Sequence, residues 1–144
     1  MNKIITHVLL VEDNPTDVMI TQEALDNANV DVALHVVENG VEAMAYLHRE
    51  GAHADAPRPN LILLDLNMPR KGGQEVLVEI KADEALRSIP VVILTTSKSD
   101  ADVLKAYECH ANCYIAKPLD FEAFTEVIRT IQKFWFTMVT LPTE

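Results

Sequence analysis

The sequence predicts a single α/β domain in which helices cover both faces of a five-stranded parallel sheet. Three observations lead to this fold class. Short apolar runs typical of strands alternate five times with helix-forming stretches along the 144 residues. The runs are rich in Val, Ile and Leu, as in strands that are buried on both faces. The links are short, which favours parallel strands joined by right-handed crossovers.

The first two strand–helix units are expected within residues 7–47. A strand at 7–11 is followed by Asn14-Pro15, which is typical of a helix start because asparagine caps and proline suits the first helical position. A strand at 30–37 is followed by Asn39, with Glu42 three residues later, which approximates a capping box. The apolar sides of the two helices are formed by Val18, Ile20, Ala24 and Leu25, and by Val41, Ala43, Met44 and Leu47.

The remaining three units follow a polar, proline-containing loop at 51–59. Strands are expected at 61–64, 91–94 and 113–116, and helices after about Gln74, after the cap Ser99 and after the cap Asp120. A doubly wound sheet of five strands suits the flavodoxin-like order 2-1-3-4-5. We find no linker, repeat or second apolar pattern, so residues 1–144 are expected to form one domain.

Polar residues follow four of the predicted strands. In the strand order 2-1-3-4-5, the carboxyl ends of these four strands are neighbours. The polar residues are Glu12 and Asp13, Asp65, Thr95 and Lys117. Three carboxylates in one pocket repel each other unless a cation neutralises them, and hard oxygen ligands suit Mg²⁺. A carboxylate such as Asp65 can attack phosphorus, while a lysine and a hydroxyl stabilise the developing charge. The pattern therefore indicates aspartyl-phosphate chemistry.

Composition limits the partners. The formal net charge of −10 argues against nonspecific nucleic-acid binding, which needs a basic face. No run of 18 apolar residues predicts a membrane span and no signal peptide is evident, so we expect a cytoplasmic protein. Cys109 and Cys113 are then expected to be reduced, and their spacing around His110 lacks the second ligand pair of a typical metal site.

Together, the motifs V-L-L-V-E-D-N at 8–14, L-D-L-N-M-P at 64–69, L-T-T at 94–96 and Y-I-A-K-P at 114–118 give a specific resemblance. The chain resembles the receiver domain of two-component response regulators over its whole length. The resemblance implies that a histidine kinase transfers a phosphoryl group to the protein, which then signals by protein–protein contact. Such a protein is a switch that assists its own phosphorylation and dephosphorylation, and it is not a turnover enzyme.

The resemblance also assigns roles to the residues at the strand ends. Asp65 would be the phosphoacceptor. Asp13, Asp65 and the backbone carbonyl of Asn67 would bind Mg²⁺, with Mn²⁺ as a substitute, and Glu12 would bind it through water. Lys117 would contact the phosphoryl group.

Three further features follow from the same resemblance. Thr95 and Tyr114 would form a switch pair, in which the hydroxyl moves toward the phosphoryl group and the aromatic ring rotates inward. The peptide bond between Lys117 and Pro118 would be cis. Where the family has Asp or Asn before the turn glycine, this chain has Gly72, so a turn or helix-cap bond is expected to be missing.

The carboxyl-terminal stretch F-W-F-T-M-V-T-L-P is similar to that of stand-alone response regulators that pair with phytochromes and dimerise. Independently, the apolar residues of the last helix repeat at steps of three and four and predict one buried stripe: Phe121, Phe124, Ile128, Ile131, Trp135 and Met138. Val127, Phe134 and Phe136 fall off this stripe and predict an exposed patch. We therefore expect a homodimer, with residues 134–144 as a dimerisation extension and Phe134, Trp135 and Phe136 in the interface.

Three other functions agree less well with the sequence. A Mg²⁺-dependent phosphohydrolase with an aspartyl-phosphate intermediate usually has Asp-x-Asp on its first strand, whereas here Asp65 lies on the third and Asn67 cannot act as an acid or base. A nucleotide- or flavin-binding protein of this fold is disfavoured because no glycine-rich phosphate loop is present. A degenerate receiver that only docks is disfavoured by the complete acidic cluster and Lys117.

Overall fold

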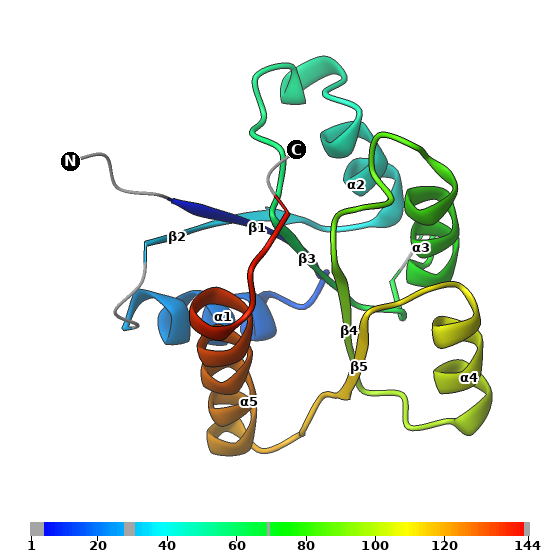
Figure 1. Ribbon diagram of the computed structural model, residues 1–144. Helices are drawn as coiled ribbons and strands as arrows, with labels where there is room; N and C mark the ends of the chain where they lie inside the picture. Colours follow the sequence, from blue (N-terminus) through cyan, green and yellow to red (C-terminus); the bar gives the residue numbers. More distant parts are fainter. Residues whose placement is uncertain (1–4, 28–30, 69, 143–144) are drawn as a thin grey trace.

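The computed structural model of the chain describes residues 5–27, 31–68 and 70–142. Its centre is a parallel sheet of five strands in the order β2-β1-β3-β4-β5 (Figure 1). The strands are β1 (Thr6–Val11), β2 (Val32–Val37), β3 (Leu61–Leu64), β4 (Val91–Thr95) and β5 (Cys113–Ala116). Fold class and strand order are confirmed, and only Val30 of the second predicted strand lies outside the described residues.

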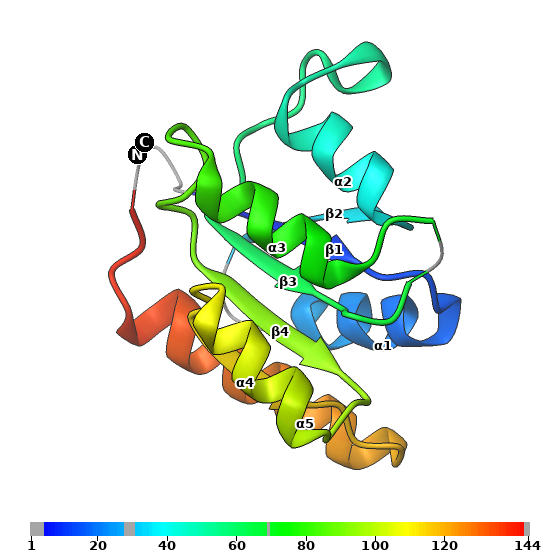
Figure 2. The ribbon, with the colours of Figure 1, turned by 90° about the vertical axis from the view of Figure 1, so that its right-hand side faces the viewer.

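The helices cover both faces of the sheet (Figures 1 and 2). They are α1 (Pro15–Asp26), α2 (Gly40–Leu47), α3 (Gly73–Ala82), α4 (Asp100–Glu108) and α5 (Phe121–Lys133), with a 3₁₀ turn η1 (Gly51–His53) and a π-helical turn η2 (Phe134–Met138). Helices α1 and α5 pack on one face, and α2, α3 and α4 pack on the other. None of the helices in the described ranges is long and apolar enough to cross a membrane.

The predicted helix caps are present. The side chain of Asn14 accepts hydrogen bonds from two backbone N–H groups of α1, at 2.9 and 3.2 Å. Asn39, Ser99 and Asp120 each accept one such bond, at 2.9, 3.4 and 2.9 Å. Each cap satisfies an otherwise unpaired donor. These four caps start α1, α2, α4 and α5 within a few residues of the preceding strand.

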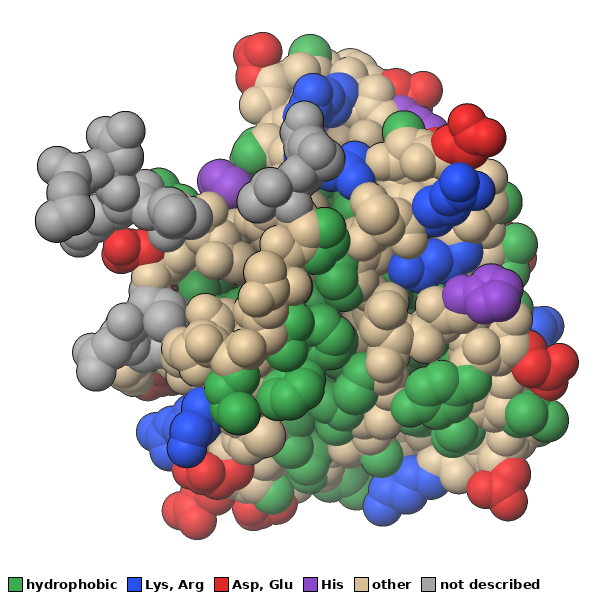
Figure 3. Space-filling view, in the orientation of Figure 1, with side chains coloured by type: hydrophobic (Ala, Val, Ile, Leu, Met, Phe, Trp, Pro, Cys, Tyr) green, Lys and Arg blue, Asp and Glu red, His purple; other side chains and the backbone are tan. Residues whose placement is uncertain are grey.

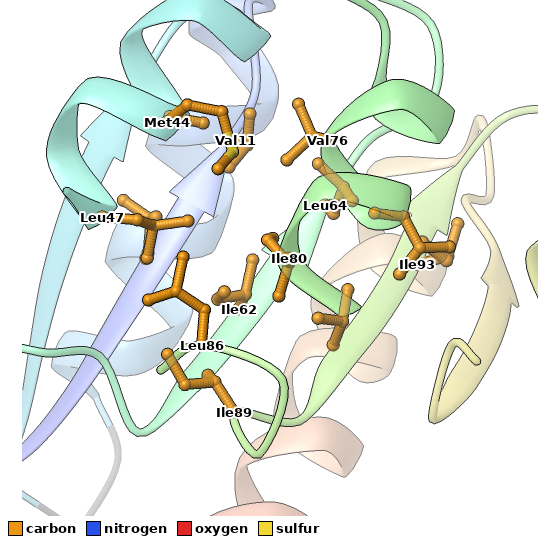
Figure 4. Close-up of a cluster of buried hydrophobic side chains, with 14 of the residues drawn as sticks. Val11, Met44, Leu47, Ile62, Leu64, Val76, Ile80, Leu86, Ile89 and Ile93 are labelled. Atoms are coloured by element: carbon orange, nitrogen blue, oxygen red, sulfur yellow. The ribbon is translucent and has the colours of Figure 1, made fainter. Parts of the chain in front are cut away.

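The alternation of side chains along the strands divides the core into two layers. Val11, Ile62 and Leu64 point toward α2 and α3, where they meet Val76 and Ile80 (Figure 4). The intervening strand residues point toward α1 and α5 and include Val8, Leu10, Leu61 and Leu63, packed on Ile20, Phe124 and Ile128. All four residues of β3 are at most 1% exposed. This central strand is buried on both faces, as its unbroken apolar run predicts.

The predicted apolar faces are wrong at their ends. Val41 is 45% exposed, because it lies in the first turn of α2 and outside the buried face of that helix. In the predicted stripe of the last helix, Phe121 and Met138 are 57% and 69% exposed. The π-helical turn changes the period after Lys133, so that Phe136 packs against the core and Met138 does not.

Candidate functional site

Strand register brings the predicted site residues to one edge of the sheet. Val11 lies beside Leu64 at the ends of β1 and β3, so the residues that follow them, Glu12 and Asp65, are neighbours. Thr95 pairs with Ala116 at the ends of β4 and β5, which places Lys117 beside β4. The edge is therefore built by parallel pairing alone, from side chains that are far apart in the sequence.

The acidic cluster consists of Glu12, Asp13 and Asp65. One carboxylate oxygen of each lies within 4.8 Å of the other two. Glu12 and Asp65 are buried, at 3% and 7% exposure, whereas Asp13 is exposed. The set offers hard oxygen ligands from one open side, which fits a Mg²⁺ ion that keeps several water ligands. Asn67 follows on the same edge, and its backbone N–H donates to Asp65 Oδ1 at 3.2 Å.

Lys117 is the cation of the site. Its side chain is 4% exposed, and Nζ contacts Glu12 Oε1, lies 2.9 Å from Asp17 Oδ2 and lies 3.5 Å from Asp65 Oδ2. A buried ammonium is costly unless it is paired, and here three carboxylates share that task. One lysine cannot balance all of the carboxylates around it, so the pocket keeps an excess of negative charge that a divalent cation would neutralise.

Burial and charge shift two protonation equilibria in this pocket. Burial raises the pKa of Glu12 to about 7, with a further rise from Asp65, while the hydrogen bond from Lys117 opposes it. Burial also works against the charged form of Lys117, but its hydrogen bonds to Glu12 and Asp17 and the charge of Asp65 outweigh that effect and raise the pKa of Lys117. The lysine therefore stays charged, and near neutral pH Glu12 is the acid that takes up a proton.

The two predicted switch residues lie on neighbouring strands but make different contacts. Thr95 is fully buried, and its hydroxyl accepts a hydrogen bond from the side-chain amide of Asn67 at 3.4 Å. The hydroxyl of Tyr114 donates to the backbone carbonyl of Ser97 at 3.0 Å. Burial raises the pKa of Tyr114, so its hydroxyl stays protonated and able to donate. Whether these residues act as a switch stays a prediction.

The peptide bond between Lys117 and Pro118 is trans, as are all peptide bonds between described residues. The prediction of a cis bond is therefore wrong for this structure. A trans bond before proline is intrinsically favoured by roughly 0.5–1 kcal/mol. The site forms with it, because Lys117 N–H donates to Thr95 O at 2.6 Å and Nζ reaches its carboxylate partners.

Sequence reasoning missed Asp17, which binds Lys117 from the first turn of α1. The available signal for the residue, though not for its contact, was its position in the first turn of a helix that begins shortly after the acidic strand end. It also missed Gly40, whose N–H donates to Lys71 O at 3.1 Å. A Cβ at Gly40 would collide with that carbonyl, so the loop after Asp65 rests on the start of α2.

The two glycines before α3 differ in what they permit. A Cβ at Gly73 would collide with the backbone carbonyl of Asp65, so this position requires glycine. A Cβ at Gly72 would meet only an ordinary contact at 3.7 Å. Gly72 caps α3 without a side-chain hydrogen bond, as the departure from the family pattern predicts.

Comparisons with known proteins identify the family and confirm the fold. Residues 8–129 match the sequence profile of the response regulator receiver domain. The chain is 46% identical over 135 residues to the response regulator Rcp1 of Synechocystis sp., covering 94% of this chain and 92% of Rcp1. It is 41% identical over 129 residues to the probable methanogenesis regulatory protein FilR2 of Methanothrix harundinacea, covering 89% and 82% of the two chains.

Two solved structures are similar over nearly the whole chain. The phosphorylated cyanobacterial phytochrome response regulator RcpA has a TM-score of 0.95 and 46% identity, with 97% of this chain and 100% of RcpA covered. The Mn²⁺-bound form of Rcp1 has a TM-score of 0.93 and 45% identity, with 96% and 99% covered.

Proposed function

Because the chain belongs to the response regulator receiver domain family, we propose that it is a phosphorylation-controlled switch whose phosphoacceptor is Asp65. The phosphoryl donor is a partner histidine kinase. One observation carries the proposal: the Asp65 carboxylate ends the central strand, with two other carboxylates within 4.8 Å and the Lys117 ammonium at 3.5 Å. Nucleophile, cation and metal ligands are thus assembled at a single point.

The geometry supports the following reaction. An Asp65 oxygen attacks phosphorus as the phosphorus–nitrogen bond of the kinase phosphohistidine breaks, and the imidazole leaves with the electron pair and takes up a proton. Oδ1 of Asp65 is held by the N–H of Asn67, while Oδ2 faces Lys117. Lys117 stabilises the charge on the phosphoryl oxygens. The buried setting of Asp65 limits the access of water to the acyl phosphate.

Divalent metal binding supports this chemistry. Asp13, Asp65 and the backbone carbonyl of Asn67 would hold Mg²⁺ directly and Glu12 through water, with Mn²⁺ as a substitute. The bound ion supplies positive charge that offsets the carboxylates and the transferring phosphoryl group. Support comes from the acidic cluster itself and from the Mn²⁺-bound form of the similar protein Rcp1.

The conformational response is assigned to Thr95 and Tyr114. Phosphorylation places new acceptor oxygens beside Lys117, which then exchanges contacts with Glu12 and Asp17 for contacts with the phosphoryl group. The Thr95 hydroxyl exchanges its bond from Asn67 for one to the phosphoryl oxygens. The Tyr114 ring then moves inward and its bond to the Ser97 carbonyl breaks. The altered surface signals to a downstream protein.

The partner kinase is proposed to be a phytochrome, and the site of action the cytoplasm. Support comes from similarity to phytochrome response regulators, including RcpA and RtBRR, the latter with 38% identity and a TM-score of 0.75. We propose that the kinase docks on the exposed apolar residues that follow Lys117 in the sequence. Leu119 and Phe121 lie two and four residues after Lys117 and are 94% and 57% exposed.

We also propose that the protein forms a homodimer. A groove of about 360 Å³ lies between β5 and the end of α5, lined mainly by Cys113, Ile115, Val127, Ile131, Phe134 and Trp135. Figure 3 shows hydrophobic side chains in a band over this side of the molecule. Because β5 is an edge strand and Phe134 is 47% exposed beside it, we propose that a second copy covers the groove. Trp135 and Phe136 both pack partly against the protein's own core, so Phe134 is the most exposed of the three aromatic residues.

Phosphotransfer from a labelled, purified phytochrome-type histidine kinase tests the acceptor. Label should move to the wild-type chain in the presence of Mg²⁺ and should not move to Asp65→Asn, which keeps the shape but lacks the nucleophile. Asp55→Asn, in an exposed loop, is the matched control and should accept label normally. Label retained on Asp65→Asn would refute the assignment.

Light scattering over a concentration series tests the dimer. Phe134→Glu should shift the protein toward the monomer, because it places a charge beside the groove. Val78→Glu is the control, since Val78 is 48% exposed on α3, on the opposite face of the sheet. A wild-type protein that stays monomeric at high micromolar concentration, with and without an acyl-phosphate mimic, contradicts the proposal.

A further inference from the structure

Two histidines face each other across the edge of the sheet. His7 on β1 and His35 on β2 lie on the face covered by α2, with Nδ1 of His7 3.0 Å from Nε2 of His35 and ring centroids 5.3 Å apart. A five-membered ring with C–N bonds near 1.33 Å has a radius of about 1.1–1.2 Å. Two nitrogens on rings with this centroid spacing therefore come no closer than about 3.0 Å. That limit is reached only when both nitrogens lie on the line between the ring centres.

This in-line arrangement identifies what can lie between the rings. It rules out face-to-face stacking, in which neither nitrogen would point at the other ring. A metal ion between two opposed nitrogens needs about 4 Å, since each bond from imidazole to zinc is about 2.0–2.1 Å. The observed 3.0 Å is the length of an ordinary hydrogen bond. The space holds one proton, donated by one ring and accepted by the other.

We propose that His7 and His35 form a proton-sharing pair that fastens the edge strand β2 and helix α2 to the sheet. The pair bridges β1 and β2 while it is neutral or carries one added proton. A second added proton leaves both nitrogens as donors, so the bond is lost and two like charges face each other. The β2–α2 edge then loosens.

The surroundings of the pair favour this behaviour. The ring of Tyr46, on α2, lies 5.8 Å from His35, and the ring of His53, in η1, lies 5.5 Å from Tyr46. Burial raises the pKa of Tyr46, partly offset by Arg49 at the end of α2, so the phenol stays neutral and offers no counter-charge. Its hydroxyl donates to the carbonyl of Pro57 at 3.0 Å.

The remaining neighbours come from the strands themselves. The backbone N–H of His7 donates to the side-chain oxygen of Asn60 at 2.8 Å. The carboxylates of Asp31 and Glu38 flank β2 in the sequence. Burial and the charge of His7 lower the pKa of His35, in agreement with a pair that resists a second proton.

The direction of the pH dependence follows from this lowered pKa. The unfolded chain binds a proton at His35 more readily than the folded protein does, so folding stability rises with pH in this range. The contribution of neutral His35 to folding stability is complete above about pH 6.5, the ordinary pKa of histidine in an unfolded chain. This contribution is lost as the pH falls from that value through the lower pKa of His35 in the folded protein. The β2–α2 edge should therefore be protected above neutral pH and exchange faster in mild acid.

NMR titration of the full chain tests the pair directly. In the wild type, we expect a scalar coupling across the hydrogen bond between the two facing nitrogens and a His35 pKa that rises when His7 is replaced by Phe. His7→Phe keeps an aromatic ring on β1 and removes only the charge and the bond. His110→Asn, in an exposed turn with positive φ that asparagine tolerates, is the control and should leave the His35 titration unchanged.

Hydrogen exchange supplies the second readout. Between pH 7.5 and pH 5, amides of β2 and α2 in the wild type should lose protection relative to those of α3, after correction for the intrinsic exchange rate. This difference should disappear in His7→Phe and persist in His110→Asn. The proposal is overturned if the His35 pKa is the same with and without His7. It is equally overturned if the loss of protection at low pH survives in His7→Phe.

Discussion

Glu12 should make the metal-free protein less stable as the pH rises through neutrality. Its carboxyl is 3% exposed, and burial raises its pKa from 4.5 to about 7. An acid whose pKa is raised by folding binds its proton more tightly in the folded state. Its contribution to stability is therefore present at low pH and is lost as the pH rises toward the folded pKa.

The magnitude follows from the two pKa values. At about 1.36 kcal/mol for each pKa unit, the rise from 4.5 to about 7 corresponds to at most about 3–4 kcal/mol. Other carboxyls are already ionised at pH 5.5. Between pH 5.5 and pH 8, ionisation of Glu12 should therefore lower the unfolding free energy by about 2 kcal/mol. Binding of Mg²⁺ requires the ionised form, so saturating Mg²⁺ should remove the loss, and metal binding near pH 6 should release a proton.

Urea unfolding at several pH values, with EDTA or with Mg²⁺, measures this effect. Glu12→Gln keeps the shape and hydrogen-bonding capacity but cannot ionise. Subtracting its unfolding free energy from that of the wild type isolates Glu12 from the histidines. Calorimetry in buffers of different ionisation enthalpy counts the protons released by metal binding. The reasoning fails if wild type and Glu12→Gln show the same pH dependence in EDTA, or if Mg²⁺ binding at pH 6 releases no proton.

Three substitutions give further expectations. Gly72→Asp should raise the unfolding free energy by about 0.5–1 kcal/mol. The site has room for a side chain, the variant chain loses less conformational entropy on folding, and α3 gains a side-chain cap. An unchanged or lower thermal midpoint contradicts this expectation. Gly73→Ala should cost about 1–3 kcal/mol and slow phosphotransfer, since its Cβ collides with the carbonyl of Asp65. Normal stability and transfer rate in that variant would show that the loop adapts. Tyr114→Phe should lower the unfolding free energy by about 1 kcal/mol, because the hydrogen bond from the hydroxyl to the Ser97 carbonyl is lost. An unchanged unfolding free energy in urea would show that water replaces the hydroxyl as the donor to that carbonyl.

The fold was predictable because its signals are local. The unbroken apolar run of 61–64 identified a central strand, and the caps at Asn14, Asn39 and Asp120 located helix starts correctly. Periodicity failed where the helix geometry changed. The π-helical turn at 134–138 redirects the aromatic residues, and no apolar spacing in the sequence distinguishes such a turn from a continuing α-helix.

The candidate site was predictable in composition and less so in contacts. The residues at strand ends could be listed once the strand order was inferred, because parallel pairing gathers those ends at one edge. The hydrogen bond from Lys117 to Asp17 could not be predicted, because it depends on the position of α1 relative to that edge of the sheet. The bond before Pro118 is trans, which is the form that a Lys-Pro dipeptide favours intrinsically; the cis bond was expected only from the family resemblance.

By itself, the amino-acid sequence determined the order of strands and helices, the composition of the acidic cluster, and the motifs that identify the receiver family. These follow from residue type, spacing and periodicity, which act over short stretches of chain. Only the tertiary structure decided the burial of Glu12, the partners of Lys117 and the facing pair of His7 and His35. Those properties depend on burial and on distances between residues far apart in sequence, which no local pattern encodes.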